Sequence, residues 1–570
     1  MLNKKLLKKM YNFTTNQKET IKIAIIMFII AIPYLLFYQY LIRNVIDNYI
    51  PNKDMNMVIT LSSILILILF IRFFFDRYLE AHRKICLYDN DLQIKNKVFS
   101  SIQDADISML DKVQAGQLFA LTTSQSFEAS QLFVWNILGI LTVRLRSILI
   151  TSIIMLFIDW QIALTVIGIF ILSYILLIPF YNKNMKTYKL LQQSIIDLQG
   201  KINEYIDSFS TTKTLRLEEI NIYDIKKLLA KSKKELLKSC KIIGAHTALF
   251  ALLTFISVIA TLIIGGNQIL LGVGVGSTIM LIVDYINDIN NHMESLLEHA
   301  HGMINRYNSF INILGIVSIK KEEDDGTLEL EKIESIEFKN VTLNYDGQNT
   351  ILDDINLKID NPMTIAIVGK SGAGKTSFVN LIPRFYNLTD GQILINGIDY
   401  KKYRLSELRK NISYVFQEPV VLNMSIKDNL MYGNDKVEFD DVVEVCQKLG
   451  IDKKIQAFDK KYDTIIDAKI DILSYGEKQL LSYARAILKN GGIVILDEVT
   501  SNLDLEFEKY VMQANEVILE NKISFLIAHR LNTIKDADLI IFIEDSHIAE
   551  MGTHDELISL NGKYASLVNA

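Results

Sequence analysis

Cysteine and proline are scarce in this sequence. The three cysteines, Cys86, Cys240 and Cys446, lie far apart, which excludes a metal-ligand or redox pairing among them. We therefore expect reduced thiols that face the cytosol. Only six prolines occur in 570 residues. This scarcity favours long uninterrupted helices, because a proline inside a helix removes a hydrogen bond and clashes with the preceding turn.

A strong charge of one sign is also lacking. The formal net charge is -5 at pH 7, and no basic tail is long enough to indicate a nucleic-acid partner. A cleavage site of the A-x-A type is absent after the basic N-terminal segment, residues 1–9. The first apolar run is therefore predicted to be a membrane span and not a removed signal peptide.

Apolar residues, by contrast, make up 50% of the chain, and the mean hydropathy is +0.23. The long apolar runs lie before residue 290, whereas short β-branched runs alternate with helical patterns from Ile333 onward. A chain of this length is too long for one ordinary domain. The sequence predicts an all-α transmembrane domain over residues 1–319, a charged linker over 320–332 and an α/β domain over 333–570.

Six apolar stretches are each long enough to cross a bilayer, which takes roughly 20 helical residues. They are Ile21–Leu41, Met57–Phe75, Trp135–Ile158, Ile162–Tyr181, Ile242–Ile264 and Leu270–Ile289. We expect tight turns at Asp159–Gln161 and Gly265–Asn267. The long polar connections, residues 76–134 and 182–241, have helical periodicity, so the spans beside them are predicted to continue as helices beyond the membrane.

The distribution of lysine and arginine predicts the orientation of the spans. Both residue types crowd the long connections and the N-terminus, and they are almost absent from the short ones. The positive-inside rule therefore places the long connections, both termini and the α/β domain in the cytosol. We expect a multi-pass protein of the plasma membrane.

Four ionisable residues within the spans, or close to them, are candidates for a substrate cavity: Arg144, Arg146, His246 and Asp284. Charges at membrane depth usually face a water-filled cavity or pair with one another. A structural pairing, or a place at the cytosolic end of a span, is therefore the alternative interpretation. A cationic cavity around Arg144 and Arg146 would favour an anionic or amphipathic cargo.

A phosphate-binding loop opens the chemistry of the second half. The motif G-x-x-x-x-G-K-[ST] follows the apolar run Thr364–Val368 and precedes a helical pattern, which is the context that this motif requires. Its backbone N–H groups and the helix N-terminus would bind phosphates, Lys375 would reach the outer phosphates and Thr376 would hold Mg²⁺. The predicted loop comprises Gly369, Lys370, Ser371, Gly372, Ala373, Gly374, Lys375, Thr376 and Ser377.

Polar side chains at the ends of other apolar runs complete a nucleotide site. Asp497 and Glu498 end the run that begins at Ile493; Asp497 is a candidate Mg²⁺ ligand, and Glu498 could polarise a water for attack on the γ-phosphate. Gln417 could bridge metal and water, and His529 could contact the γ-phosphate. The ring of Tyr345 could stack on adenine, or it could be an ordinary core aromatic.

A second candidate phosphate-binding element lies about a hundred residues further on. The sequence from Leu473 to Gln479 precedes a helical pattern, and Ser474 and Gly476 would stand at the helix N-terminus. In isolation, a plain capped helix is the favoured interpretation of this segment.

Together these residues resemble the ATP-binding cassette (ABC) transporters, and the elements follow one another in the family's order. The resemblance implies a Walker A motif at Gly369–Ser377, a signature at Leu473–Gln479, a Walker B motif with the catalytic Glu498 at Ile493–Glu498, a D-loop at Ser501–Asp504, an A-loop tyrosine at Tyr345, a Q-loop at Gln417 and a switch histidine at His529. It implies a fold of six transmembrane helices followed by a P-loop ATPase domain. ATP and Mg²⁺ are the implied cofactors.

The six spans ahead of one cassette resemble a half-transporter of the exporter type. Such a chain works as a dimer, here a homodimer or a heterodimer, in contact with membrane lipid. Each ATP is then held between the phosphate loop of one chain and the signature of the other. The implied function is ATP-driven efflux of an amphipathic cargo: a drug or other small molecule, a lipid or a peptide. The stretches Asp111–Gln117 and Glu204–Thr214 would lie near the coupling helices.

Two departures from the family pattern concern the signature and the stretch just upstream of it, Asp467–Ile470, which lacks the acidic-glycine pattern usual there. The usual sequence is LSGGQ, whereas this chain has Tyr475 and Glu477 at the third and fifth positions. We expect these two residues to affect the rate of ATP turnover and whether the two ATP sites are equivalent. An importer built on the exporter-like fold, and a channel or receptor gated by a cassette, are the alternative functions.

Overall fold

The computed structural model describes residues 13 and 17–569, except 111–112, 114, 133, 135, 137–138, 273–274, 346–349, 435, 468–471, 498–504 and 528–533. The chain forms two compact units. The first comprises residues 1–103 and 114–318, and the second comprises 104–113 and 319–570. Each unit is described separately below.

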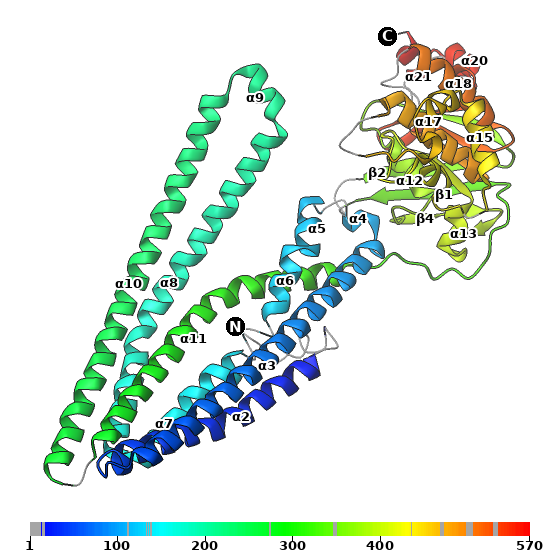
Figure 1. Cartoon of the computed structure of the whole chain (residues 1–570). Helices are drawn as coiled ribbons and strands as arrows, with labels where there is room; N and C mark the ends of the chain where they lie inside the picture. Colours follow the sequence, from blue (N-terminus) through cyan, green and yellow to red (C-terminus); the bar gives the residue numbers. More distant parts are fainter. Residues whose placement is uncertain are drawn as a thin grey trace. The chain divides into compact units, whose positions relative to one another are not determined.

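The first unit is helical (Figure 1). Its elements are α2 (Gln17–Asn44), η1 (Val45–Tyr49), α3 (Met55–Gln103), α5 (Ala115–Thr122), α6 (Ser124–Gln131), η3 (Ile140–Leu145), α7 (Arg146–Ile158), α8 (Trp160–Asp207), α9 (Phe209–Leu215), α10 (Glu218–Leu270) and α11 (Gly276–Val317). Buried apolar side chains of α7, α8, α10 and α11 form its main core, which includes Met155, Ile162, Phe250 and Ile286.

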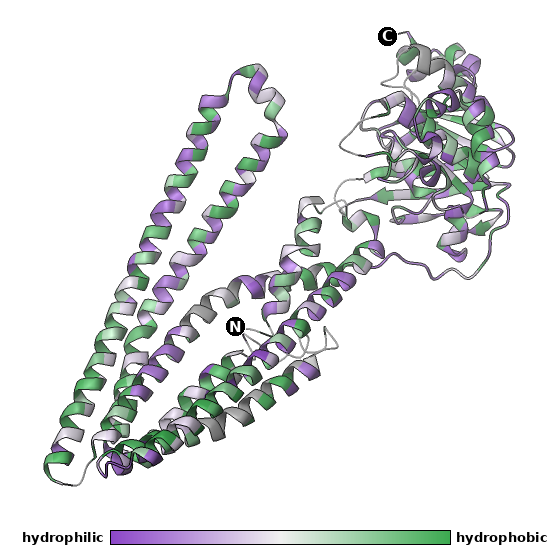
Figure 2. Cartoon of the chain, viewed as in Figure 1, coloured by the Kyte–Doolittle hydropathy of each residue, from purple (hydrophilic) through white to green (hydrophobic). Residues whose placement is uncertain are grey.

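Three helices of the part of the chain that the structure describes are long and apolar enough to cross a membrane: α3, α8 and α10. The described residues of two other predicted spans are helical in α2 and in η3 and α7, and the sixth predicted span is helical in α11 from Gly276 onward. Helices α8 and α10, with 48 and 53 residues, continue past the predicted spans, and their extension beyond the membrane stays a prediction. Figure 2 shows that their apolar residues gather at the end away from α9.

The two predicted tight turns have different outcomes. Asp159 separates α7 from α8 and caps α8, since its carboxylate accepts hydrogen bonds from the N–H groups of Gln161 and Ile162 at 3.0 Å. The turn expected at Gly265–Asn267 is wrong, because α10 continues through these residues to Leu270. Gly265 instead permits close packing against α11: a Cβ at this position would lie 2.6 Å from the side chain of Ile279.

The second unit contains two sheets. An antiparallel sheet has the order β2-β1-β4-β5, and a mainly parallel sheet has the order β10-β9-β3-β8-β7-β6. Strands β3, β6, β7, β8 and β9 are parallel, so their carboxyl ends meet at one edge. The strands are β1 (Ile336–Asn344), β2 (Thr350–Ile359), β3 (Met363–Val368), β4 (Asp390–Ile395), β5 (Ile398–Asp399), β6 (Ile412–Val415), β7 (Ile493–Asp497), β8 (Ile523–Ile527), β9 (Leu539–Glu544) and β10 (His547–Gly552).

Short helices surround these sheets. They are α12 (Lys375–Leu381), η4 (Tyr400–Lys402), α13 (Leu405–Lys410), α14 (Ile426–Met431), α15 (Phe439–Lys448), α16 (Asp452–Gln456), η5 (Lys461–Asp463), α17 (Tyr475–Lys489), α18 (Leu505–Leu519), α20 (His554–Ser559) and α21 (Lys563–Val568). One apolar cluster fills the space between the two sheets and α12, and a second joins α14, α15, α17 and α18 to the other face of the parallel sheet. Strand β6 contributes to both, because Ile412 lies in the first cluster and Val415 in the second.

A short segment of the first long connection packs with the second unit. Residues 104–113, which contain α4 (Ile107–Leu110), were counted with the membrane domain in the sequence-based prediction. The backbone of Asp104–Asp106 pairs with Lys320–Glu322, through hydrogen bonds of 3.1 and 2.9 Å. The predicted linker is itself held against this unit, since Glu322 forms an ion pair with Arg409 and Asp324 accepts a hydrogen bond from the N–H of Leu405.

Candidate nucleotide site and membrane cavity

The predicted phosphate loop leaves the carboxyl end of β3, in the interior of the parallel sheet, and ends in α12. Ligands of open α/β sheets bind at this edge. Gln417 follows β6 closely and Asp497 is the last residue of β7, so both predicted ligands come from parallel strands that end at the same edge. Asp497 is buried.

The loop has a backbone that requires glycine. Gly374 precedes α12 with φ 98°, in the left-handed region, and Gly372 has φ 80°. A Cβ at Gly369 would lie 2.3 Å from the carbonyl oxygen of Ile543. The ammonium group of Lys375 turns inward and donates hydrogen bonds to the carbonyl oxygens of Gly369 at 2.8 Å and Lys370 at 3.2 Å. These features form a cradle with the shape and charge that a polyphosphate needs.

Glu544 supports this loop from the end of β9. Its carboxylate forms ion pairs with Lys370, at 3.1 Å, and with Lys563. The hydrogen bond from Lys563, followed by that from Lys370, holds the pKa of Glu544 below its usual range. The sequence-based prediction missed this residue, although the parallel order of β3 and β9 places the end of β9 beside the loop.

Tyr345 lies directly after β1 and is 39% exposed. Its hydroxyl donates a hydrogen bond to Ser377 at the start of α12, at 2.8 Å, and its ring lies 4.8 Å from that of Tyr386. An exposed ring anchored to the loop-following helix is suited to stack on a base. Tyr386 was not predicted, and a second aromatic within a loop gives no periodic signal.

Three predicted site residues, Glu498, Asp504 and His529, lie outside the described residues. The strands that lead to two of them are described. Glu498 follows Asp497 directly, and β8 ends at Ile527, two residues before His529. The chain therefore approaches both positions from the sheet edge that carries the phosphate loop.

The second predicted phosphate-binding element forms the N-terminus of α17. Ser474 is the N-cap residue and forms a capping box with Glu477, whose carboxylate accepts a hydrogen bond from the N–H of Ser474 at 2.7 Å. Glu477 also forms an ion pair with Lys454 of α16, at 3.4 Å. Gly476 is buried, and the hydroxyl of Tyr475 donates a hydrogen bond to the backbone carbonyl of Gln417 at 2.7 Å. Of the two predicted phosphate-binding residues at this helix start, Ser474 is exposed and Gly476 is buried.

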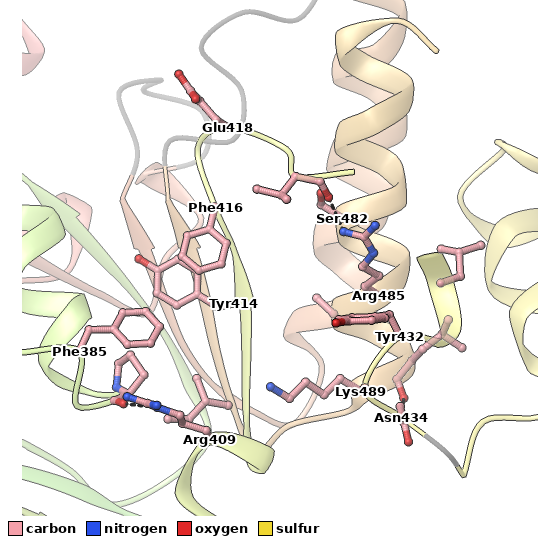
Figure 3. Close-up of a pocket in the computed structure, with 17 residues that line it drawn as sticks. Phe385, Arg409, Tyr414, Phe416, Glu418, Tyr432, Asn434, Ser482, Arg485 and Lys489 are labelled. Carbon is pink, nitrogen blue, oxygen red and sulfur yellow. Dashed lines mark hydrogen bonds between the residues drawn. The ribbon is translucent and has the colours of Figure 1, made fainter. Parts of the chain in front are cut away.

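A cavity of about 480 Å³ lies between α17 and the segment that follows β6 (Figure 3). One wall is aromatic, with the rings of Tyr414 and Phe416 stacked at 4.1 Å and Phe385 beside them. Arg485 and Lys489 of α17 form the opposite wall. Burial lowers the pKa of Lys489 and raises that of Tyr414. Residues of β6 and residues of α17 thus line opposite sides of this cavity.

The first unit has a cavity of about 640 Å³ among η3, α7, α8, α10 and α11. Its walls are mostly apolar, and the aromatic side chains include Phe170, Tyr174 and Phe250. Polar atoms come from the hydroxyls of Ser152, Tyr174 and Tyr181 and from the imidazole of His246. The cavity is suited to an amphipathic molecule, since a few polar groups stand in an apolar lining.

Of the four predicted cavity residues, only His246 lines this cavity. Arg146 is buried, and Asp284 is exposed elsewhere on the unit. Arg144 donates hydrogen bonds to the hydroxyl of Ser295 at 2.8 Å and to the carbonyl of Gly139 at 3.1 Å. These contacts agree with a structural pairing of Arg144, and a part for Arg144, Arg146 and Asp284 in binding cargo stays a prediction.

The arrangement in the second unit fits a nucleoside triphosphate with a magnesium ion. The glycine-dependent cradle, Lys375 and the helix N-terminus would bind the phosphates, and the Tyr345 ring would bind the base. The hydroxyl of Thr376, the amide oxygen of Gln417 and the carboxylate of Asp497 are the oxygen ligands that Mg²⁺ prefers. Described residues alone do not form a second wall for the phosphates.

Comparison with known proteins agrees with both halves. Residues 21–286 match the family model described as "ABC transporter transmembrane region", and residues 352–501 match the model described as "ABC transporter". The first match lies in the first unit except for residues 104–113, the second match lies in the second unit, and the two follow one another in the order expected from the motifs.

Relatives and solved structures match over nearly the whole chain. The chain is 28% identical over 561 residues to "Putative multidrug export ATP-binding/permease protein YgaD" of Bacillus subtilis, with 96% of this chain and 95% of that protein covered. It is 28% identical over 586 residues to "ATP-dependent lipid A-core flippase" of Desulfotalea psychrophila, with full coverage of both. A bacterial Atm1-family ABC exporter, solved with ATP bound, has the same fold, with a TM-score of 0.80, 21% identity, and 97% and 98% of the two chains covered.

Proposed function

This chain belongs to the ABC transporters, as an ATP-hydrolysing half-transporter of the exporter type, and from that premise we propose that it exports an amphipathic cargo across the plasma membrane. The observation that carries the proposal is the cavity of about 640 Å³ in the membrane unit. Its apolar lining with a few hydroxyls and one imidazole suits a molecule with an apolar body and a small polar part.

The names of two relatives support the same class of cargo. One is named for multidrug export and the other for flipping lipid A-core. Drugs handled by such exporters and lipid A share a large apolar part, although they differ in size. The cavity would admit a drug-sized molecule or the acyl part of a lipid, since drug-sized ligands occupy roughly 300–1,000 Å³.

The ATP sites would be completed by a second chain. In the first chain, Lys375 would neutralise phosphate charge, Tyr345 would hold the base, and Thr376, Gln417 and Asp497 would hold Mg²⁺. Ser474 and Gly476 of the second chain would face the γ-phosphate. Glu498 would polarise the attacking water, and His529 would contact the γ-phosphate. Bound ATP supplies the free energy that shifts the dimer between its two conformations.

Movement of the cassettes would reach the membrane through the long connections. Residues 104–113 pack with the second unit, and α9 forms the tip of the hairpin made by α8 and α10 (Figure 1). Phe209 and Leu215 of α9 are 60% and 61% exposed, which suits docking on another surface. The basic long connections support a cytosolic place for these elements and for the cassette.

A transport assay tests this function. The full-length protein would be reconstituted in nanodiscs for ATPase rates and in vesicles for transport, with ethidium and an NBD-labelled phospholipid as probes. We expect at least one probe to raise the ATPase rate and to accumulate inside inside-out vesicles only when ATP is hydrolysed. If neither probe did either, the proposal of an amphipathic cargo would be wrong. ATP-dependent loss from such vesicles would indicate an importer, and ATP-gated flow down a gradient would indicate a channel.

Two neighbouring residues of α8 provide a matched pair of variants. Tyr174 and Ile175 are both exposed in the isolated chain, at 60% and 57%, but only Tyr174 lines the cavity. We expect Tyr174→Ala to weaken the response to the probe and Ile175→Ala to leave it unchanged.

Mass measurement of the particle purified with and without a co-expressed second half-transporter would distinguish a homodimer from a heterodimer.

A further inference from the structure

The two unusual residues of the signature both make contacts within the chain. Tyr475 replaces a glycine of the usual motif, and its hydroxyl donates a hydrogen bond of 2.7 Å to the backbone carbonyl of Gln417. The two residues lie 58 positions apart and on different elements. A glycine at position 475 could not make this contact, so the link between the signature and the Gln417 segment is a property of this sequence.

Other side chains of α17 hold the same segment. The amide of Gln479 donates to the carbonyl of Phe416 at 3.4 Å, and the guanidinium of Arg485 donates to the carbonyl of Val420. Arg485 approaches the segment from the side of α17 that borders the 480 Å³ cavity (Figure 3). Tyr475 extends this set of contacts to the first turn of the helix, where Ser474 and Gly476 lie.

The first turn is held firmly enough to transmit a displacement. The capping box fixes Ser474 to Glu477, and the ion pair with Lys454 fixes Glu477 to α16. Leu480 and Leu481 are buried in the apolar cluster that α17 shares with α14, α15 and α18. A shift of the Gln417 carbonyl would therefore move the signature turn as a whole instead of only rotating the Tyr475 side chain.

In the proposed dimer these two elements serve different ATP molecules. Gln417 would act at the site built on the phosphate loop of its own chain, whereas Ser474 and Gly476 would act at the site built on the phosphate loop of the partner. We propose that Tyr475 is a positioning residue that couples the two ATP sites, because it joins the metal-facing segment of one site to the phosphate-facing turn of the other. This inference rests on the proposed function and adds a route of communication to it.

The coupling is measurable as cooperativity. Binding at one site would bias the position of Gln417, and through Tyr475 it would bias the signature turn at the other site. The wild-type ATPase rate should then rise with ATP concentration with a Hill coefficient above 1, up to a limit of about 2 for two sites. Tyr475→Phe keeps the ring and removes only the hydroxyl, so the Hill coefficient should fall below the wild-type value.

Tyr483 provides the control on the same helix. Its hydroxyl donates a hydrogen bond of the same length, 2.7 Å, but to Asn515 of α18 instead of the Gln417 segment. The assay uses full-length protein in nanodiscs and compares wild type, Tyr475→Phe and Tyr483→Phe, with thermal stability measured for each. We expect Tyr483→Phe to retain the wild-type Hill coefficient, even if its buried position lowers the melting temperature.

The outcomes separate this inference from the function on which it rests. Wild-type ATPase activity without cooperativity, or a Hill coefficient unchanged in Tyr475→Phe, would overturn the coupling while leaving an ATP-driven transporter in place. Complete loss of hydrolysis in Tyr475→Phe with normal ATP binding would also overturn it, because the hydroxyl would then act in hydrolysis itself. A wild-type protein without any ATPase activity would instead contradict the proposed function.

A second variant tests the same point by a different change. Tyr475→Gly combined with Glu477→Gln restores the usual residues of the motif and removes both intrachain contacts. We expect this variant to hydrolyse ATP with a Hill coefficient below that of the wild type. A Hill coefficient equal to the wild-type value in the double variant would show that the Tyr475 contact does not contribute to the coupling.

Discussion

Asn387 donates a hydrogen bond from its side-chain amide to the carboxylate of Asp106, at 3.1 Å, and so joins two residues that lie 281 positions apart. The other oxygen of Asp106 accepts hydrogen bonds from the N–H of Ser108 at 2.9 Å and from its hydroxyl at 2.6 Å. Asp106 is buried, so its carboxylate fixes the start of α4 against the second unit. This side chain links the first long connection to the segment between α12 and β4 that contains Asn387.

Replacement of Asp106 should uncouple transport from hydrolysis. Asp106→Ala leaves the partly buried amide of Asn387 without its acceptor and removes the hydrogen bonds from Ser108 at the start of α4. We expect the basal ATPase rate to persist while the stimulation by a transported probe is lost. Asp104→Ala is the control, because Asp104 forms only an exposed ion pair with Lys321. An unchanged stimulation ratio in Asp106→Ala would show that this contact does not transmit the signal.

Tyr345 should contribute to ATP affinity through its ring. Aromatic stacking on a base is worth about 1–3 kcal/mol, so Tyr345→Ala should raise the Kd for ATP about fivefold or more. Tyr345→Phe keeps the ring and loses only the hydrogen bond to Ser377, and it should bind ATP nearly as well as wild type. Equilibrium binding of a fluorescent ATP analogue measures both. Equal losses in the two variants would assign the contribution to the hydroxyl.

Glu544 should make the stability of the second unit depend on pH. The pKa of this carboxyl is lowered in the folded protein by Lys563 and Lys370, so its contribution is present above the ordinary glutamate value of 4.5 and is lost as the pH falls through the lower folded value. Glu544→Gln should therefore lower the melting temperature at pH 7. The difference from wild type should shrink at pH values below 4.5. A difference in melting temperature that stays constant at pH values below 4.5 would contradict the ion-pair assignment.

Glu498 should be required for hydrolysis and dispensable for binding. General base catalysis contributes about a hundredfold or more to rate, so Glu498→Gln should reduce ATPase activity by at least that factor and leave the Kd for ATP unchanged. Single-turnover hydrolysis and equilibrium binding, measured on the same preparation, check the two halves of this prediction. Hydrolysis near the wild-type rate would remove Glu498 from the catalytic role.

The parts of the molecule that follow from local sequence signals were predictable. The strand before Gly369 and the helix after Gly374 predict the phosphate loop, because an apolar strand, a glycine-rich turn and a helix follow one another in the sequence. Asp159 likewise predicts the start of α8, since its side chain accepts hydrogen bonds from the N–H groups of the residues two and three positions further on. In these cases the residues that decide the structure are neighbours in the chain.

The features that were missed depend on distant partners. Gly265 was read as a turn residue, yet its lack of a side chain serves packing against Ile279 on another helix. The contact of Tyr475 with Gln417 and that of Asp106 with Asn387 join residues 58 and 281 positions apart. Neither periodicity nor turn propensity carries information about such pairs, because each side chain is also an ordinary choice for its own element.

The length of α8 and α10 has a mechanical consequence. The predicted span of α8 ends at Tyr181 and the helix continues to Asp207, an arm of about 39 Å at 1.5 Å per residue. A rotation of about 5° at the membrane end would then move α9 by about 3 Å, roughly half a helical turn. Such a lever can convert a displacement of angstroms at α9 into a small change of tilt within the bilayer, where a few degrees alter the access to a cavity between helices.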